Sequence, residues 1–331
     1  MRAIEIAQFG PIEWATLVER PDPQPQPGEV IVEVHCAPVN FVDSLVVTGA
    51  YQYLPPLPFT PGKGPAGVVC GLGFGVHSLR VGDRVLAMAE QGGYAEKIAV
   101  AADQCYRLPK GLSFPQAAAM SVAFDTAWCA LRDRVRLQPN ETVLVLGASG
   151  AVGIAAVQLA KAMGARVLAG IARAEKAVAV QRAGADAVID LAATDLRDSL
   201  RAQVYQLTEG HGADVVLDPL GGDVFDAALR AVAWRGRLVV IGFASGRIPT
   251  VRVNYLLLKN IEVSGLQISD YRKRRPDMMA ACYAELFEWF ATGRLVSMDV
   301  ETYPLERAVE AMAAVRDRRA SGRVLLAIRE P

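Results

Sequence analysis

Short apolar or alternating runs, broken by proline and glycine, dominate the chain up to about Met120. The runs EVIVEVHC, AGVVCGLG, DRVLAMA and YAEKIAVA are typical of β-strands joined by turns. The proline-rich segment PDPQPQPGE precedes EVIVEVHC and can form neither a helix nor a central strand. The pattern therefore predicts a β-rich domain over residues 1–122.

From about Ser121 the pattern changes to apolar runs that alternate with alanine-rich helical stretches. We expect six strands, at ETVLVLG, RVLAGIA, DAVID, ADVVLDPL, RLVVIGF and IEVSGLQ. Alternation of strand and helix predicts an α/β fold, with a doubly wound parallel sheet covered by helices on both faces, over residues 123–266.

The last segment, residues 267–331, is too short to form a third domain. Its pattern predicts a helix around Asp277–Thr292, a strand near VSMDVETY, a helix after PLERAVEAM and a final strand RVLLAI. We expect this segment to fold back onto the first domain and complete it.

Composition agrees with a globular protein of two domains, because the chain has 331 residues, 52% of them hydrophobic, and 35 basic residues balance 35 acidic ones. This balance indicates neither a nucleic-acid partner nor an anionic membrane surface. No apolar run is long enough to span a bilayer, and the first residues lack the pattern of a secretory signal. Five scattered cysteines without a CxxC pair indicate reduced thiols in a cytoplasmic protein.

One segment, ETVLVLGASGAVGIAAVQLAKAMGA, combines a buried strand, a glycine-rich turn and a helix. Small residues in such a turn let the backbone approach a pyrophosphate, whose charge lies on the N–H groups of the following helix. The spacing here is GxxGxxG, one position away from GxGxxG, and a purely structural turn is the alternative. The candidate cofactor-binding residues are Gly147, Ser149, Gly150, Ala151, Val152 and Gly153.

The end of the second strand decides between NAD and NADP. An NAD site usually places an acidic residue there to bind the ribose hydroxyls, about 20 residues after the glycine turn. This sequence reads LAGIARAEK, with no acid before Glu175, whereas Arg173 and Lys176 offer positive charge to a 2′-phosphate. Each cation alone could be a solvated residue at a helix start, but together they favour NADPH.

Seven collinear segments resemble the zinc-free quinone-oxidoreductase (zeta-crystallin-like) branch of the medium-chain dehydrogenases/reductases. These segments are APVNFVDSLVVTGAYQYLPPLPFTPG, LRVGDRVLAM, GASGAVGIAAVQLAK, LDPLGGDVF, WRGRLVVIGFASGRIP, LLLKNIEVSG and YPLERAVEAM with RRASGRVLL. The resemblance implies a GroES-like catalytic domain completed by the C-terminal segment, a Rossmann domain, an active site in the cleft between them, and homodimers joined through the Rossmann sheets.

Zinc-dependent members of the superfamily bind their catalytic metal through Cys, a His-Glu pair, and a later Cys or Asp. At the corresponding positions this sequence has Asn40, Lys63 with Gly64, and about Val122. A catalytic zinc needs three protein ligands with lone pairs, which these side chains do not supply. We therefore expect no metal. Members of the similar branch carry Glu where Gly64 stands, so the floor of the substrate site is expected to differ.

The resemblance also implies roles for single residues. Tyr51 matches a tyrosine that assists the acceptor in related enoyl reductases, and Asn40 lies in the same substrate-lining segment. We expect Asp43 to order this loop and Tyr53 to be a packing residue. Further candidate cofactor contacts are Asn40, Thr126, Phe243, Gln267 and, at the phosphate, Arg319. No histidine matches a catalytic spacing.

The predicted function is NADPH-dependent reduction of a small quinone or enone by direct hydride transfer. An enoyl-thioester reductase is an alternative, for which the basic run at 272–275 would contact a phosphate; a solvated loop is the simpler interpretation of that run. A third possibility is an NADPH-binding protein with vestigial activity.

Overall fold

The structure is a computed structural model that describes residues 1–329. It divides into two units, each with its own core. Among the described residues, the first unit comprises residues 1–122, 271–291 and 297–329, and the second comprises residues 123–270 and 292–296.

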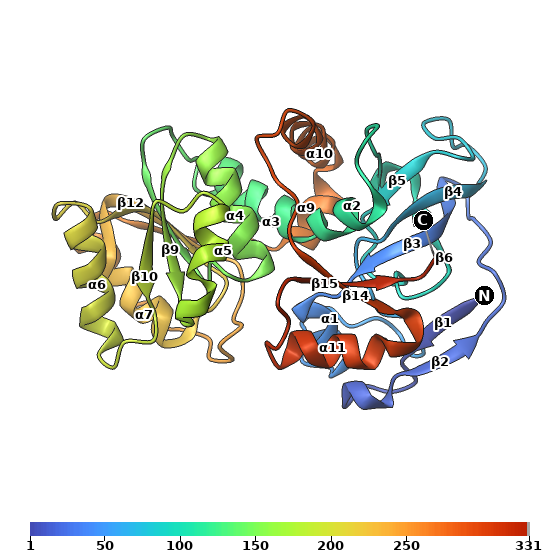
Figure 1. Ribbon diagram of the computed structural model, residues 1–331, viewed down its shortest axis with the longest axis horizontal. Helices are drawn as coiled ribbons and strands as arrows, with labels where there is room; N and C mark the ends of the chain where they lie inside the picture. The colour runs from blue at the N-terminus through green and yellow to red at the C-terminus, as the bar shows by residue number, and fades with distance from the viewer. Residues whose placement is uncertain (330–331) are drawn as a thin grey trace. The chain divides into compact units, whose positions relative to one another are not determined.

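The second unit is built on a parallel sheet of six strands, with the order β10-β9-β8-β11-β12-β13 (Figure 1). This is the order of a doubly wound dinucleotide-binding fold, in which the chain reverses direction between the first strand, β8, and the fourth, β11. The predicted α/β fold class and its six strands are therefore confirmed. The strands are β8 (Thr142–Leu146), β9 (Arg166–Ile171), β10 (Ala187–Asp190), β11 (Ala213–Asp218), β12 (Val232–Val240) and β13 (Glu262–Gly265).

Helices of the second unit lie between successive strands, except α3, which precedes β8. Helix α3 packs against α4, and α6 packs against α7. All five residues of β8 are buried, as expected for a central strand covered on both faces. The helices are α3 (Ala123–Cys129), α4 (Ala151–Ala162), α5 (Ala177–Arg182), α6 (Leu196–Leu207), α7 (Gly222–Ala231) and α8 (Asn254–Lys259), and α9 (Ile268–Arg274) follows β13.

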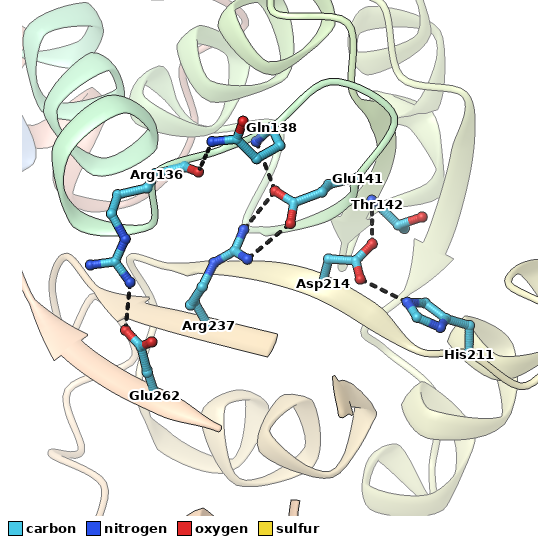
Figure 2. A network of polar contacts seen from close by, with 8 residues as sticks. All are labelled: Arg136, Gln138, Glu141, Thr142, His211, Asp214, Arg237 and Glu262. Atoms are coloured by element: carbon cyan, nitrogen blue, oxygen red, sulfur yellow. Dashed lines mark hydrogen bonds and ion pairs between the residues drawn. The ribbon is translucent and has the colours of Figure 1, made fainter. Parts of the chain in front are cut away.

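Polar contacts join the strands at the amino-terminal edge of this sheet (Figure 2). Glu141 accepts two hydrogen bonds from the Arg237 guanidinium, at 2.9 and 2.6 Å. Asp214 accepts the Thr142 N–H at 2.8 Å, and its other oxygen lies 2.7 Å from the His211 ring. These contacts stabilise the edge that lies opposite the carboxyl ends of the strands.

The first unit contains a sheet with the strand order β14-β15-β3-β4-β5-β7, and β6 pairs with β3. In Figure 1 the C-terminal strand β15, in red, lies beside β3, in blue, with which it pairs antiparallel. The last part of the chain thus completes the sheet that the first part begins. The strands are β3 (Glu29–Pro38), β4 (Ala66–Leu72), β5 (Arg84–Ala87), β6 (Lys97–Ala101), β7 (Cys105–Arg107), β14 (Val300–Pro304) and β15 (Arg323–Ala327).

Two further strands, β1 (Arg2–Glu5) and β2 (Thr16–Glu19), form an antiparallel pair in the same unit. Its helices are α1 (Phe41–Val47), α2 (Phe114–Met120), α10 (Pro276–Ala291) and α11 (Ala308–Arg316). None of the helices within residues 1–329 is long and apolar enough to cross a membrane.

One expectation about polar residues was wrong in part. The basic run at 272–275 is not a loop, because α9 extends to Arg274, and Arg272 is buried with an ion pair to Glu90 at 2.9 Å. The other three residues of the run are exposed, as expected for a solvated run. Tyr53 is 52% exposed and packs against a neighbouring ring. Its ring meets Tyr51 edge-on, with the ring centroids 6.5 Å apart.

Candidate cofactor and acceptor sites

The glycine turn follows β8, directly at the point where the strand order reverses. Gly147 has φ +62°, a conformation that favours glycine, and Gly150 precedes the first residue of α4. A Cβ on Gly153 would lie 2.3 Å from the carbonyl oxygen of Gly147, so only glycine fits there. The turn therefore holds the helix start close to the strand end, as a pyrophosphate cradle requires.

The residues predicted around this turn lie where a ligand can approach them. Ser149 and Gly150 are exposed, and Ala151 and Val152, in the first turn of α4, are half-buried. The first N–H groups of a helix have no acceptor within the helix and carry partial positive charge. An anionic group of a cofactor is the ligand that this geometry suits.

Both predicted phosphate-binding cations follow β9, the strand next to β8. Arg173 is exposed and Lys176 is half-buried, each with contacts inside the protein. Residues 171–174 carry no carboxylate, and Glu175 is exposed. The carboxyl end of β9 thus has the charge expected for a bound phosphate.

The other predicted cofactor residues are spread over both units. Thr126 is buried in α3, Phe243 is exposed after β12, and Gln267 follows β13, where its side-chain oxygen accepts the Ser269 N–H at 3.1 Å. Arg319 belongs to the first unit, where it is exposed and lies 3.4 Å from Asp317. The contact of Arg319 with a cofactor phosphate stays a prediction.

In the first unit the predicted acceptor residue Asn40 caps α1 and is part of a buried polar cluster. Its amide nitrogen donates to Asp43 at 3.1 Å, and its oxygen accepts a hydrogen bond from Arg323 at 2.6 Å. Asp43 also accepts the Asn40 backbone N–H at 2.8 Å and the Tyr94 hydroxyl at 2.9 Å. The prediction that Asp43 orders this loop is confirmed.

Burial governs the electrostatics of this cluster. Desolvation raises the pKa of Asp43, although the nearby Lys63 ammonium and the hydrogen bonds oppose the shift. Desolvation also lowers the pKa of Arg323 to about 10, although the negative charge of Asp43 opposes this shift. Because both polar ends of the Asn40 side chain are used inside the unit, its contacts indicate a role in holding the loop.

A second buried group of charges lies next to Tyr51. The Lys63 ammonium donates to the Glu90 carboxylate at 2.7 Å and to the Glu90 carbonyl at 2.8 Å, while Arg272 donates to the other carboxylate oxygen at 2.9 Å. The same ammonium lies 5.9 Å from the centre of the Tyr51 ring. The sequence had indicated Lys63 only as a missing zinc ligand and gave no sign of its partners Glu90 and Arg272.

The donor set does not fit a catalytic zinc. Lys63, at the position of a histidine ligand, is an ammonium held by Glu90, and Gly64 has no side chain. A Cβ on Gly64 would also lie 2.6 Å from the Ser121 hydroxyl oxygen, so a longer side chain has no room without movement. Within residues 1–329 no three His, Cys, Asp or Glu side chains lie together as metal ligands.

Sequence reasoning also missed Asp218, a buried carboxyl group at the end of β11. The sequence did contain a signal for this role. An apolar strand that ends in Asp and is followed by Pro-Leu-Gly-Gly often forms a turn whose backbone N–H groups donate to the Asp side chain.

These two sites define an oxidoreductase scaffold, and comparison with known proteins identifies its family. Residues 26–110 match the alcohol dehydrogenase GroES-like domain, and residues 151–285 match the zinc-binding dehydrogenase family. The chain is 39% identical over 301 residues to a quinone oxidoreductase-like protein 2 homolog of Nematostella vectensis, a match that covers 90% of this chain and 81% of the relative. It is 36% identical to the quinone oxidoreductase-like protein 2 of Bos taurus, over 95% of this chain and 89% of the relative.

Solved structures that resemble this chain are also quinone oxidoreductases. The Escherichia coli quinone oxidoreductase complexed with NADPH superimposes with a TM-score of 0.91 at 31% identity, covering 99% of this chain and 100% of that one. The quinone oxidoreductase of Pseudomonas syringae gives a TM-score of 0.92 at 31% identity, covering 99% of both chains. The chain belongs to the medium-chain dehydrogenase/reductase superfamily, in its quinone oxidoreductase-like branch.

Proposed function

We propose that this protein is an oxidoreductase that transfers hydride from NADPH to quinones or activated C=C bonds, without a metal. The observation that carries the proposal is the Gly147–Gly153 turn at the strand-order reversal of a six-stranded parallel sheet. The similarity to a quinone oxidoreductase whose structure contains NADPH supports the same cofactor here.

The charge at the end of β9 supports NADPH rather than NADH. The guanidinium of Arg173 and the ammonium of Lys176 can form charge-assisted hydrogen bonds with a 2′-phosphate. A ribose diol would instead need a carboxylate acceptor, and none stands between Ile171 and Ala174. Arg319 is proposed as a further phosphate contact.

The cofactor supplies the hydride, so the protein must bind the acceptor and stabilise the charge that develops on its oxygen. We propose Tyr51 as the hydrogen-bond donor, with Asn40 holding the loop that presents it. The Lys63–Glu90–Arg272 group has two cations against one carboxylate and so adds net positive charge beside this donor, with the Lys63 ammonium 5.9 Å from the centre of the Tyr51 ring. Quinones and enones are already electron-poor, so hydrogen bonds and fixed charge suffice for their activation.

We also propose a cytoplasmic homodimer. All five cysteines are free thiols, as expected in a reducing compartment. Strand β13 forms an edge of its sheet, and the preceding helix α8 exposes Leu257 and Leu258, which are 78% and 72% exposed. An open edge next to exposed apolar side chains suits a second copy of the chain. Light scattering of the purified protein tests this proposal.

An enoyl-thioester reductase remains the second candidate. Arg272 cannot serve it, because its side chain is buried against Glu90. The cation that could still contact a phosphate of a thioester substrate is Lys273, whose ammonium lies 5.8 Å from the centre of the exposed Tyr53 ring.

The test is a steady-state screen of NADPH oxidation with matched quinones, enones and enoyl thioesters. Turnover with quinones or enones supports the proposed function, whereas turnover confined to thioesters favours the second candidate. NADPH binding without turnover of any acceptor indicates a binding protein with vestigial activity and refutes the enzymatic proposal.

A further inference from the structure

Asp218 is a buried carboxyl group at the carboxyl end of β11, the strand beside β8 in the sheet. One of its oxygens accepts the N–H groups of Leu220 and Gly221, both at 2.9 Å, and the other lies 3.2 Å from the Gly221 nitrogen. Burial raises the pKa of Asp218 to about 6, although these two N–H groups favour the ionised form.

The turn that Asp218 holds has a conformation that depends on glycine. Gly221 has φ +67° and Gly222 has φ +60°. A Cβ on Gly221 would lie 3.0 Å from the Phe243 ring and 3.0 Å from the carbonyl oxygen of Arg247. Residues 219–222 therefore pack tightly against the loop after β12, and a shift of this turn would move that loop.

The same turn reaches the phosphate cradle. A Cβ on Gly147 would lie 3.0 Å from a methyl carbon of Leu220, so the Leu220 side chain covers the first glycine of the cradle. Leu220 is also the residue whose N–H donates to Asp218. One carboxyl group thus fixes a turn that contacts two predicted cofactor-binding elements, the Gly147 turn and the loop with Phe243.

Backbone hydrogen bonds join this turn to the loop along its length. The N–H of Ile241 donates to the carbonyl of Asp218 at 2.7 Å, and the N–H of Ser245 donates to that of Leu220 at 2.9 Å. In the opposite direction, the N–H of Gly222 donates to the carbonyl of Arg247 at 3.0 Å. The turn and the loop are therefore one connected structure at the carboxyl edge of the sheet.

We propose that Asp218 is a positioning residue for the cofactor, whose carboxylate fixes the 219–222 turn and thereby the shape of the NADPH site. The inference rests on the proposed function. It assigns Asp218 no contact with the reacting atoms. Its effect on NADPH passes through Leu220, Gly221 and Phe243.

The test compares Asp218→Ala with Asp218→Asn by fluorescence titration of NADPH at pH 7.5. Alanine removes the acceptor of both N–H groups, and we expect the Kd for NADPH to rise at least tenfold. The asparagine oxygen can still accept both N–H groups from the position of the oxygen at 2.9 Å, so its Kd should stay within about threefold of wild type.

A pH series provides a readout that a purely structural role would not change. Protonated Asp218 keeps a neutral oxygen acceptor like that of asparagine, so we expect wild-type affinity to fall below pH 6 toward that of Asp218→Asn, whose affinity should not follow this titration. Phosphate groups have a second pKa near 6, so NADH, which lacks the 2′-phosphate, is titrated in parallel. Because the folded pKa of Asp218, about 6, lies above the usual 3.8, stability is lost as the pH rises from 3.8 to about 6, and the full cost of ionising Asp218 is present at pH 7.5. Asp218→Asn should therefore keep the wild-type melting temperature at pH 7.5 or exceed it.

The matched control is Asp214→Ala, which removes a carboxylate from the amino-terminal end of the same strand (Figure 2). It should cost stability but leave the Kd for NADPH unchanged. Equal affinities for Asp218→Ala and wild type, or parallel pH profiles for wild type and Asp218→Asn, would overturn the inference. Wild-type protein that binds no NADPH at all would instead refute the proposed function.

Discussion

Cofactor preference is the property that the structure allows to be tested most directly, by changing Arg173 and Lys176 together to alanine. Both follow β9, one exposed and one half-buried. A hydrogen bond to a charged group contributes about 1.5–3 kcal/mol when sheltered, and an exposed ion pair about 0–1 kcal/mol. For this pair we expect a combined loss of about 1.5–4 kcal/mol, which is about 10- to 1000-fold in the Kd for NADPH.

The assay is titration of NADPH and NADH by fluorescence, at low and at moderate salt. NADH should bind the double variant nearly as it binds wild type, because it lacks the charge that these cations meet. Higher salt should reduce the difference between the cofactors, since exposed charges are screened. Arg166→Ala, at the exposed amino-terminal end of the same strand, is the control and should change neither Kd. Equal use of both cofactors by wild type, or equal weakening of both in the variant, would refute the assignment.

Three further predictions concern the first unit. Tyr51→Phe removes one hydroxyl and should lower kcat/KM, because the transition state loses about 1–3 kcal/mol of stabilisation. The melting temperature should not fall to a matching extent. Unchanged kinetics with several acceptors would show that Tyr51 has no catalytic role. Purified protein should contain no stoichiometric zinc and keep its activity in chelator, whereas about one zinc per chain, with activity lost on removal, would contradict metal-free transfer. Gly64→Ala should destabilise the fold more than Gly75→Ala, because both have positive φ but only Gly64 faces a neighbour at 2.6 Å, the Ser121 hydroxyl. Similar melting temperatures for the two variants would show that Ser121 moves aside.

The parts of the fold that sequence could predict are those encoded by contiguous residues. The strand ETVLVLG, its glycine turn and the helix after it follow one another along the chain, so apolar pattern and glycine spacing were enough to predict them. The Lys63–Glu90–Arg272 group joins positions 27 and 182 residues apart, and no local pattern connects them. A basic run usually lies on a solvated face. Arg272 is buried instead, because it pairs with the carboxylate of Glu90, 182 residues away in the sequence.

The positions at which zinc-dependent relatives place their metal ligands make other contacts in this chain. Lys63 binds Glu90 within the unit, and Gly64 leaves room only for the Ser121 hydroxyl. A ligand side chain at position 63 would remove the ion pair with Glu90, and one at position 64 would clash with the Ser121 hydroxyl. A zinc ion stabilises an alkoxide by its own charge, which alcohol oxidation requires. In the proposed reaction the acceptor is already electron-poor, so the Tyr51 hydroxyl, beside the net positive Lys63–Glu90–Arg272 group, can meet the developing charge without a metal.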